Sequence, residues 1–219
     1  MTNKVFTQLL LLFPLWSCSP STDCCAPVPE PEAEEVRIVK DWEPRADVQV
    51  EGSIFTVSYN EQLQQPNWIR YDVRSIVKAA DRDGMNFYEV DSIITSDNDD
   101  YYNNPWDRGH LAPAGSFTDS YENLYATFSF LNCTLQKDQL NRGEWAYLEE
   151  EIRDWANEFG TLNVEIILHF GAESTTLDTG ATIPDAYTKR VTFPDGSQRC
   201  FYFLNQDTTA GWETHEIDC

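Results

Sequence analysis

Residues 138–160 read DQLNRGEWAYLEEEIRDWANEFG, and this segment predicts one long amphipathic helix. Asp138 is a suitable N-cap, and Gly160 is a natural end for the helix. At about 100° per residue, the apolar side chains fall on one stripe and most of the acidic ones fall opposite. The stripe consists of Trp145, Leu148, Ile152, Trp155, Ala156 and Phe159. We therefore expect this helix to pack one face against the body of the protein.

Three polar residues of the predicted helix fall on or beside its apolar stripe. Asn141 lies within the stripe in the first turn, and Glu149 and Arg153 lie on its flank. A polar side chain that faces the body of a protein needs a partner there. Two structural interpretations stay open. Asn141 can be a helix-start residue, and Glu149 with Arg153 can be an i,i+4 ion pair worth about 0.2–0.5 kcal/mol.

Strand patterns flank this helix on both sides. Residues 68–78 alternate, with Ile69 and Tyr71 on one face and Arg70 and Arg74 on the other. Further strands are predicted at residues 54–59, 126–134, 162–170, 187–193 and 199–205. Strands around one long helix indicate an α+β fold with a mostly antiparallel central sheet.

The composition is that of a folded but strongly acidic chain. Its 219 residues are 41% hydrophobic and include 7 Trp, 10 Tyr and 12 Phe, which excludes wholesale disorder. The formal net charge is −22, from 15 Lys and Arg against 37 Asp and Glu. Because binding of phosphate groups depends largely on Lys and Arg, this balance taken alone argues against a nucleic-acid partner.

The N-terminal sequence indicates export. Residues 1–17 combine an early lysine with the apolar run LLLLFPLW, which is too short to span a membrane, and they predict a signal peptide. The residues before Cys18 resemble a bacterial lipobox, so a lipid on Cys18 would anchor the protein at a membrane or cell surface; simple secretion is the alternative. Residues 18–51 are rich in proline and acid and predict an extended spacer, which leaves residues 52–219 as the folded domain.

Six cysteines in an exported chain suggest disulfides. If Cys18 carries a lipid, five remain, and one of these is unpaired or bridges two chains. Cys200 and Cys219 are one possible pair, but the sequence leaves the connectivity open.

The segment DRGHLAPA at residues 107–114 is the densest group of chemically reactive residues. An arginine, a glycine and a histidine in succession place a base beside a fixed cation on a tight bend. The chain has three histidines. A lone histidine is usually a surface or core residue, which is our interpretation of His169 and His215; the neighbours of His110 set it apart.

The stretch WDRGHLAPA at residues 106–114 resembles the DRGH signature of the DNA/RNA non-specific endonucleases, the ββα-metal nuclease family. The stretch LNCTLQKDQLNRGEWAYLEEEIR at residues 131–153 is similar to the second block of that family in order and spacing. Outside these blocks, shorter stretches between residues 54 and 205 match more loosely. The resemblance implies a ββα-metal catalytic motif within the α+β fold.

This resemblance also implies the residue roles of a metal-dependent phosphodiester hydrolase. His110 matches the general base that takes the proton of the attacking water, and a neutral imidazole with a pKa near 6.5 suits that role at neutral pH. Asn141 matches the single direct protein ligand of Mg²⁺, with Mn²⁺ or another divalent ion as alternatives. Glu149 matches a carboxylate that holds metal-bound waters, and Arg108 and Arg153 match residues that contact the phosphate.

The remaining assignments concern support and substrate binding. Asn132 matches a position that supports the site and completes the expected catalytic group, although Leu131 and Leu135 differ from the residues common around it. Arg82 and Arg142 are expected to bind substrate. The chain is thus expected to be an exported Mg²⁺-dependent endonuclease that cleaves DNA and RNA with little sequence preference.

Two other functions remain open. One is a surface-anchored nucleic-acid-binding or adhesion protein that keeps the fold without catalysis, and the presence of His110, Asn141 and Glu149 weighs against it. The other is a phosphodiesterase for small substrates. Only two features argue against it, the family resemblance and the basic face of the strand that carries Arg70 and Arg74.

The acidic charge persists after the spacer is removed, because residues 52–219 carry 11 basic and 28 acidic side chains, a net charge of −17. Most of these cations lie in the segments assigned to the site. They predict a narrow basic cleft on an acidic body, formed by Arg70, Arg74, Lys78, Arg82, Arg108, Lys137, Arg142 and Arg153. Such a cleft would bind nucleic acid weakly and release it readily.

Overall fold

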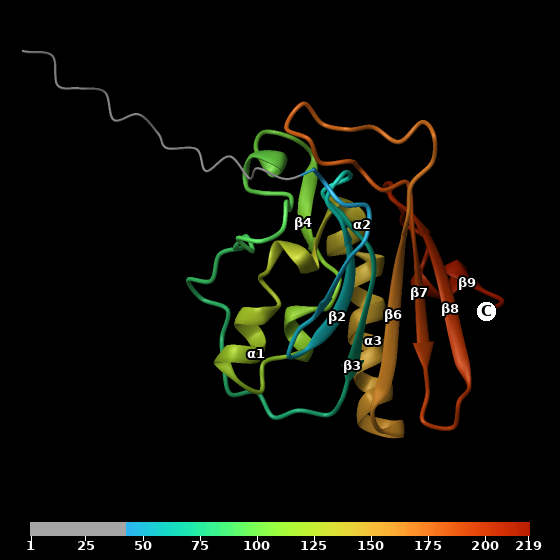
Figure 1. Ribbon diagram of the computed structural model, residues 1–219. Helices are drawn as coiled ribbons and strands as arrows, with labels where there is room; N and C mark the ends of the chain where they lie inside the picture. Colours follow the sequence, from blue (N-terminus) through green and yellow to red (C-terminus); the bar gives the residue numbers. More distant parts are fainter. Residues whose placement is uncertain (1–42) are drawn as a thin grey trace, which may run out of the picture. The chain divides into compact units, whose positions relative to one another are not determined.

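The computed structural model describes residues 43–219 (Figure 1). The predicted signal peptide at residues 1–17, the lipidation candidate Cys18 and most of the predicted spacer lie outside the described residues. Within the described part, no helix is long and apolar enough to cross a membrane.

Seven strands form one antiparallel sheet in the order β1-β2-β3-β6-β7-β8-β9. They are β1 (Val48–Glu51), β2 (Phe55–Asn60), β3 (Gln65–Val73), β6 (Leu162–His169), β7 (Ala186–Thr192), β8 (Gln198–Leu204) and β9 (Glu216–Ile217). The sheet confirms the predicted α+β class. Because β1 pairs along β2, the folded part begins before residue 52, within the segment for which the sequence predicts a spacer.

Two of the predicted strands differ from the observed ones. β3 ends at Val73, so residues 74–78 leave the sheet, and Val77 is 86% exposed. No single strand covers residues 126–134, and that prediction is wrong. The segment holds the end of α1 (Tyr121–Ala126), a 3-10 helix η3 (Phe130–Asn132) and the start of β5 (Cys133–Lys137).

Local capping explains why residues 126–134 do not form a strand. The hydroxyl of Ser120 accepts a hydrogen bond from the Asn123 amide and caps α1, and the hydroxyl of Ser129 accepts one from the Leu131 amide and caps η3. A serine hydroxyl can thus accept a hydrogen bond from a nearby backbone amide, which then does not pair with a neighbouring strand. The strand prediction rests on the apolar residues of this segment, and apolar composition gives no sign of such serine caps.

The predicted helix over residues 138–160 is broken at Gly143, where α2 (Asp138–Arg142) gives way to α3 (Glu144–Phe159). Gly143 leaves helical geometry, with φ −110° and ψ −114°, and a Cβ at this position would lie 2.7 Å from the carbonyl oxygen of Gln139. The predicted apolar stripe of α3 is buried except for Phe159, which is 51% exposed near the helix end. α3 packs against β3 and β6 on one face of the sheet (Figure 1).

A second, two-stranded antiparallel sheet carries the DRGH segment. β4 (Trp106–His110), a strand that the sequence did not predict, pairs with β5 in a register that sets His110 opposite Cys133. A Cβ on Gly109 would lie 2.6 Å from the Cβ of Gln136, so the close approach of the two strands requires glycine here. β4, β5 and the following helices α2 and α3 form the ββα arrangement that the resemblance implies.

The main core lies between the large sheet and α3, and a smaller cluster around Phe130 and Leu135 lies under the two-stranded sheet. A disulfide joins Cys200 on β8 to Cys219, one of the pairings that the sequence left open. Among the described residues, Cys133 is buried and free.

Candidate active site

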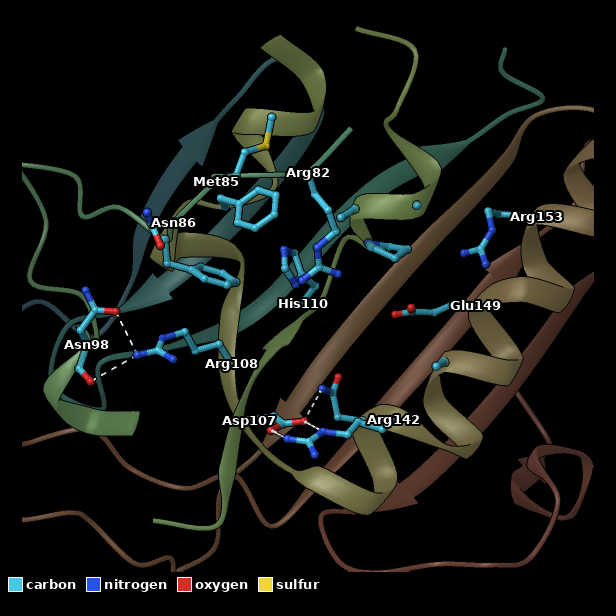
Figure 2. Close-up of a pocket in the computed structure, with 17 residues that line it drawn as sticks. Arg82, Met85, Asn86, Asn98, Asp107, Arg108, His110, Arg142, Glu149 and Arg153 are labelled. Atoms are coloured by element: carbon cyan, nitrogen blue, oxygen red, sulfur yellow. Dashed lines mark hydrogen bonds and ion pairs between the residues drawn. The ribbon is translucent and has the colours of Figure 1, made fainter. Parts of the chain in front are cut away.

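A cavity of about 710 Å³ lies between β4, the segment before it and the α2–α3 helices (Figure 2). It brings together seven of the eight predicted site residues, from segments far apart in the sequence. These are Arg82, Arg108, His110, Asn141, Arg142, Glu149 and Arg153. The eighth, Asn132, does not line the cavity.

The ring of His110 lies between two phenylalanines. Its centroid is 4.8 Å from that of Phe87 and 5.0 Å from that of Phe128. Its Nε2 atom is buried and has no hydrogen-bond partner among the described residues. Burial, and secondly the positive charge of Arg82, lower the pKa of His110 from 6.5 to about 3. The imidazole is therefore neutral at neutral pH, the form that a proton acceptor needs.

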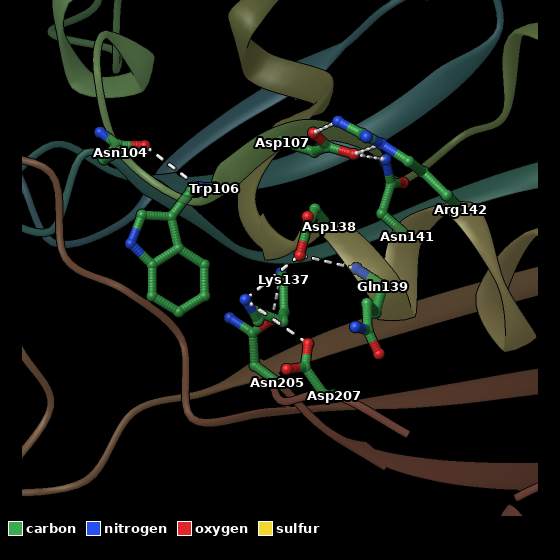
Figure 3. Close-up of polar contacts among 10 residues, drawn as sticks. All are labelled: Asn104, Trp106, Asp107, Lys137, Asp138, Gln139, Asn141, Arg142, Asn205 and Asp207. Carbon is green, nitrogen blue, oxygen red and sulfur yellow. Dashed lines mark hydrogen bonds and ion pairs between the residues drawn. The ribbon is translucent and has the colours of Figure 1, made fainter. Parts of the chain in front are cut away.

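Asp107 of β4 orients the side-chain amide of Asn141 (Figure 3). Asn141 Nδ2 donates to Asp107 Oδ2 at 2.9 Å, and Arg142 Nε donates to the same oxygen at 2.7 Å. Since the amide nitrogen is committed to Asp107, the amide oxygen of Asn141 remains for another ligand. An amide oxygen is a hard donor of the kind that Mg²⁺ prefers.

Glu149 on α3 directs its carboxylate toward the cavity (Figure 2). A buried lysine lies beside this carboxylate. Lys189 on β7 is fully buried, with Nζ 3.8 Å from Glu149 Oε1 and 3.5 Å from the ring centroid of Trp145. Burial raises the pKa of Glu149, and the charges of Lys189 and Arg153 oppose this. Burial likewise lowers the pKa of Lys189, and Glu149 opposes that. Glu149 forms an ion pair with Lys189 and none within 4 Å with Arg153, the i,i+4 pair that the sequence left open as a structural alternative.

Three arginines line the cavity without an acidic partner within 4 Å among residues 43–219, namely Arg82, Arg108 and Arg153. Arg108 donates to Asn98 Oδ1 at 3.0 Å, a neutral partner that leaves its charge uncompensated. Arg153 passes over Gly115, where a Cβ would lie 3.4 Å from its Nη1 atom. The cavity therefore presents net positive charge to an anionic ligand.

This basic region is smaller than the eight-cation cleft that the sequence predicts. Five of the predicted cations form ion pairs, which are Arg70–Glu165, Arg74–Asp119, Lys78–Asp81, Lys137–Asp138 and Arg142–Asp107. Of these five, Arg142 is the cation that lines the cavity, and there Asp107 compensates its charge. Alternation along a strand predicts which side chains share a face. It does not show which acidic side chains of neighbouring elements lie close enough to pair with the cations on that face.

Asn132 is fully buried behind the site. Its Oδ1 atom accepts from the Ala112 amide at 2.7 Å, and its Nδ2 atom donates to the carbonyls of Ala112 and Thr127 at 2.9 and 2.8 Å. These bonds brace the loop that follows His110. Asn132 thus braces the site from behind and does not line the cavity, which is compatible with the supporting position that the resemblance implies.

Two residues of the site were not singled out by the sequence. Asp107 belongs to the DRGH segment, but its contact with Asn141 depends on how β4 and α2 pack. Lys189 did leave a signal in the sequence, because it shares its strand parity with the apolar residues Tyr187 and Val191. A lysine at an inward-facing position of a strand indicates a buried charge that needs a partner.

The order strand, strand, helix around one basic cavity is the arrangement of the ββα class of nuclease domains. Family comparison makes the assignment specific. Residues 44–219 match the DNA/RNA non-specific endonuclease family, and the chain belongs to it. The resemblance found in the DRGH segment is thereby confirmed.

Named relatives share part of this chain. A mitochondrial nuclease EXOG of Danio rerio is 31% identical over 108 residues, 47% of this chain and 32% of that protein. A nuclease of Syncephalastrum racemosum is 33% identical over 118 residues, 50% of this chain and 37% of that protein. The chain thus spans about a third of the length of these curated relatives. The crystal structure of an EndoG/EndoGI complex shares the fold, with a TM-score of 0.69 at 21% identity over 80% of this chain and 82% of that one.

Proposed function

We propose that this protein is an exported, Mg²⁺-dependent endonuclease that hydrolyses phosphodiester bonds of DNA and RNA with little sequence preference. The observation that carries the proposal is a neutral histidine, His110, in a cavity where three of the four arginines have no acidic partner within 4 Å among the described residues. Family membership supports nucleic acid as the substrate.

His110 would act as the general base. A ring nitrogen takes one proton from the water that attacks the phosphorus atom, and Phe87 and Phe128 hold the imidazole plane in place. A bound phosphate offsets the charge of Arg82, one cause of the lowered pKa of His110. Substrate binding would therefore raise the pKa of the base toward the range where proton transfer is efficient.

The residues present fit a hard divalent cation. Asp107 binds the amide nitrogen of Asn141, so the amide oxygen is available to a cation. Within residues 43–219, no cluster of three or more His, Cys, Asp or Glu side chains would supply further direct ligands. An ion held here would keep mostly water ligands, as Mg²⁺ prefers, and Glu149 would accept hydrogen bonds from those waters. The chemistry that such an ion supplies is Lewis-acid stabilisation of the phosphate charge.

Arg108 and Arg153 would bind the nonbridging phosphate oxygens, because their guanidinium groups are not neutralised by carboxylates. Charge stabilisation in a partly enclosed cavity contributes most when charge develops in the transition state. None of these contacts selects a base, so they support cleavage with little sequence preference.

Export is supported by the sequence of residues 1–17 and by the Cys200–Cys219 disulfide, because disulfides persist in oxidising compartments. We further propose that Cys18 carries a lipid anchor. Metabolic labelling with a fatty acid should mark the wild-type protein and not Cys18→Ser, and an unlabelled wild type would indicate simple secretion.

The activity is tested with supercoiled plasmid and RNA, incubated with Mg²⁺ or with chelator. We expect cleavage of both in Mg²⁺ alone, and His110→Ala should slow it by about 10²–10⁴, the range for a positioned base. His215→Gln, which changes a histidine that does not line the cavity, is the matched control and should cleave at the wild-type rate. A wild type that binds both polymers and cleaves neither with any divalent ion would favour the nucleic-acid-binding alternative.

A further inference from the structure

A lysine occupies an otherwise apolar row of residues across five neighbouring strands of the large sheet, β2 to β8. The cross-strand partners in this row are Val57 on β2, Ile69 on β3, Ile166 on β6, Lys189 on β7 and Phe201 on β8. All five are fully buried. A buried ammonium loses its hydration, and hydrophobic residues of similar volume are often as stabilising or more so in such places. Packing alone therefore does not explain why this position carries a charge.

The charge of Lys189 faces α3 and the base of the cavity. Its Nζ atom lies 3.5 Å from the ring centroid of Trp145 and 3.8 Å from Glu149 Oε1, too far for a direct hydrogen bond. Glu149 is the acidic group that acts on Lys189. The other titratable groups around this carboxylate are Arg153, also on α3, and Tyr71 on β3.

We propose that Lys189 is a positioning residue whose charge favours the ionised form of the Glu149 carboxylate and directs it at the substrate side of the cavity. This inference rests on the proposed nuclease function. Without Lys189, burial favours the protonated carboxyl, which accepts fewer hydrogen bonds from water. Arg153 does not replace it, because Arg153 lines the cavity and the substrate phosphate engages its charge.

The first test compares pH–rate profiles of the purified protein with those of Lys189→Met, Glu149→Gln and the double variant. In Lys189→Met we expect kcat/KM at pH 7 to fall at least tenfold, the acid limb of the profile to move up by about one pH unit or more, and activity to recover at higher pH. Lys189→Arg retains the charge and should keep the acid limb in place. Lys78→Met removes an exposed lysine and is the matched control.

The double variant separates positioning from independent catalysis. If Lys189 acts through Glu149, Lys189→Met causes no further loss of rate in the Glu149→Gln background. The neutral pair also removes the uncompensated buried carboxylate, so this variant should fold even if Lys189→Met folds poorly. An unchanged acid limb in Lys189→Met, or an equal loss in both backgrounds, would overturn the proposal.

A second readout requires no turnover. A carboxyl whose pKa is raised in the folded state retains a proton that the unfolded chain has lost, so stability falls as pH rises from the usual glutamate pKa to the raised value. In Lys189→Met this fall in the thermal midpoint should extend to higher pH than in wild type, and Glu149→Gln should abolish the extension. Identical midpoint profiles for Lys189→Met and wild type would overturn the inference. If Lys189→Met shows the extension but the wild type cleaves no nucleic acid, only the proposed nuclease function is refuted.

Discussion

Removing the Asp107 carboxylate should raise the requirement for metal without weakening substrate binding. Asp107 accepts the 2.9 Å hydrogen bond that fixes the Asn141 amide and also pairs with Arg142. In Asp107→Ala the amide of Asn141 turns freely, and its oxygen no longer has one preferred direction. The same change frees the charge of Arg142 beside the cavity, which favours binding of an anionic polymer.

The size of the effect follows from this hydrogen bond. A hydrogen bond to a charged group contributes about 1.5–3 kcal/mol, and we use the lower end because the Asp107 side chain is 17% exposed. About 1.4 kcal/mol is a tenfold change in an equilibrium constant. We therefore expect the Mg²⁺ concentration for half-maximal cleavage to rise about tenfold, while KM for DNA does not rise.

The assay is plasmid cleavage titrated with Mg²⁺ and separately with Mn²⁺, at several DNA concentrations. Asp107→Asn keeps an oxygen acceptor without the charge and should give an intermediate midpoint. Asp207→Asn, a change to an exposed acid that pairs with Lys137, is the control and should leave the midpoint unchanged. An Asp107→Ala protein with the wild-type metal midpoint, or one whose loss appears only in KM, would refute the orienting role.

Two further predictions concern the DRGH segment. Gly109→Ala should lower the free energy of unfolding by about 1–3 kcal/mol, because the new Cβ would overlap Gln136, and a denaturant melt that matches wild type would show that the two strands separate easily. The lowered pKa of His110 means that the unfolded chain takes up a proton between pH 6.5 and about 3 before the folded state does, so wild type loses up to about 1.4 kcal/mol of stability per pH unit on acidification through that window. His110→Gln should flatten this slope in thermal melts, and an unchanged slope would contradict a buried neutral imidazole.

Much of the secondary structure could be predicted because apolar periodicity fixes which face of an element is buried. The stripe from Trp145 to Ala156 and the alternation in β3 follow from that rule. The errors fall where a local contact overrides the periodicity. Gly143 interrupts the helix because its backbone leaves helical geometry at a point where a Cβ would collide with the Gln139 carbonyl oxygen. Ser120 and Ser129 cap helices in a segment that looks like a strand.

The site residues could be predicted from motif spacing, but their partners could not. Seven of the eight expected residues line one cavity, whereas Asn132 braces the loop behind it. The basic cleft was overestimated because Arg70 and Arg74 meet acids from β6 and from the segment near α1. Such pairs join residues 95 and 45 positions apart in the chain, and strand parity carries no information about them.

The amino-acid sequence by itself determined the fold class, the family and the identity of the reactive groups, because periodicity and motif spacing are local properties of the chain. The tertiary structure decided the state of those groups. Burial and the charge of Arg82 keep His110 neutral, Asp107 orients the Asn141 amide, and Lys189 lies beside Glu149. Each of these effects depends on burial or on a distance between elements remote in sequence, and burial and distance exist only once the chain has folded.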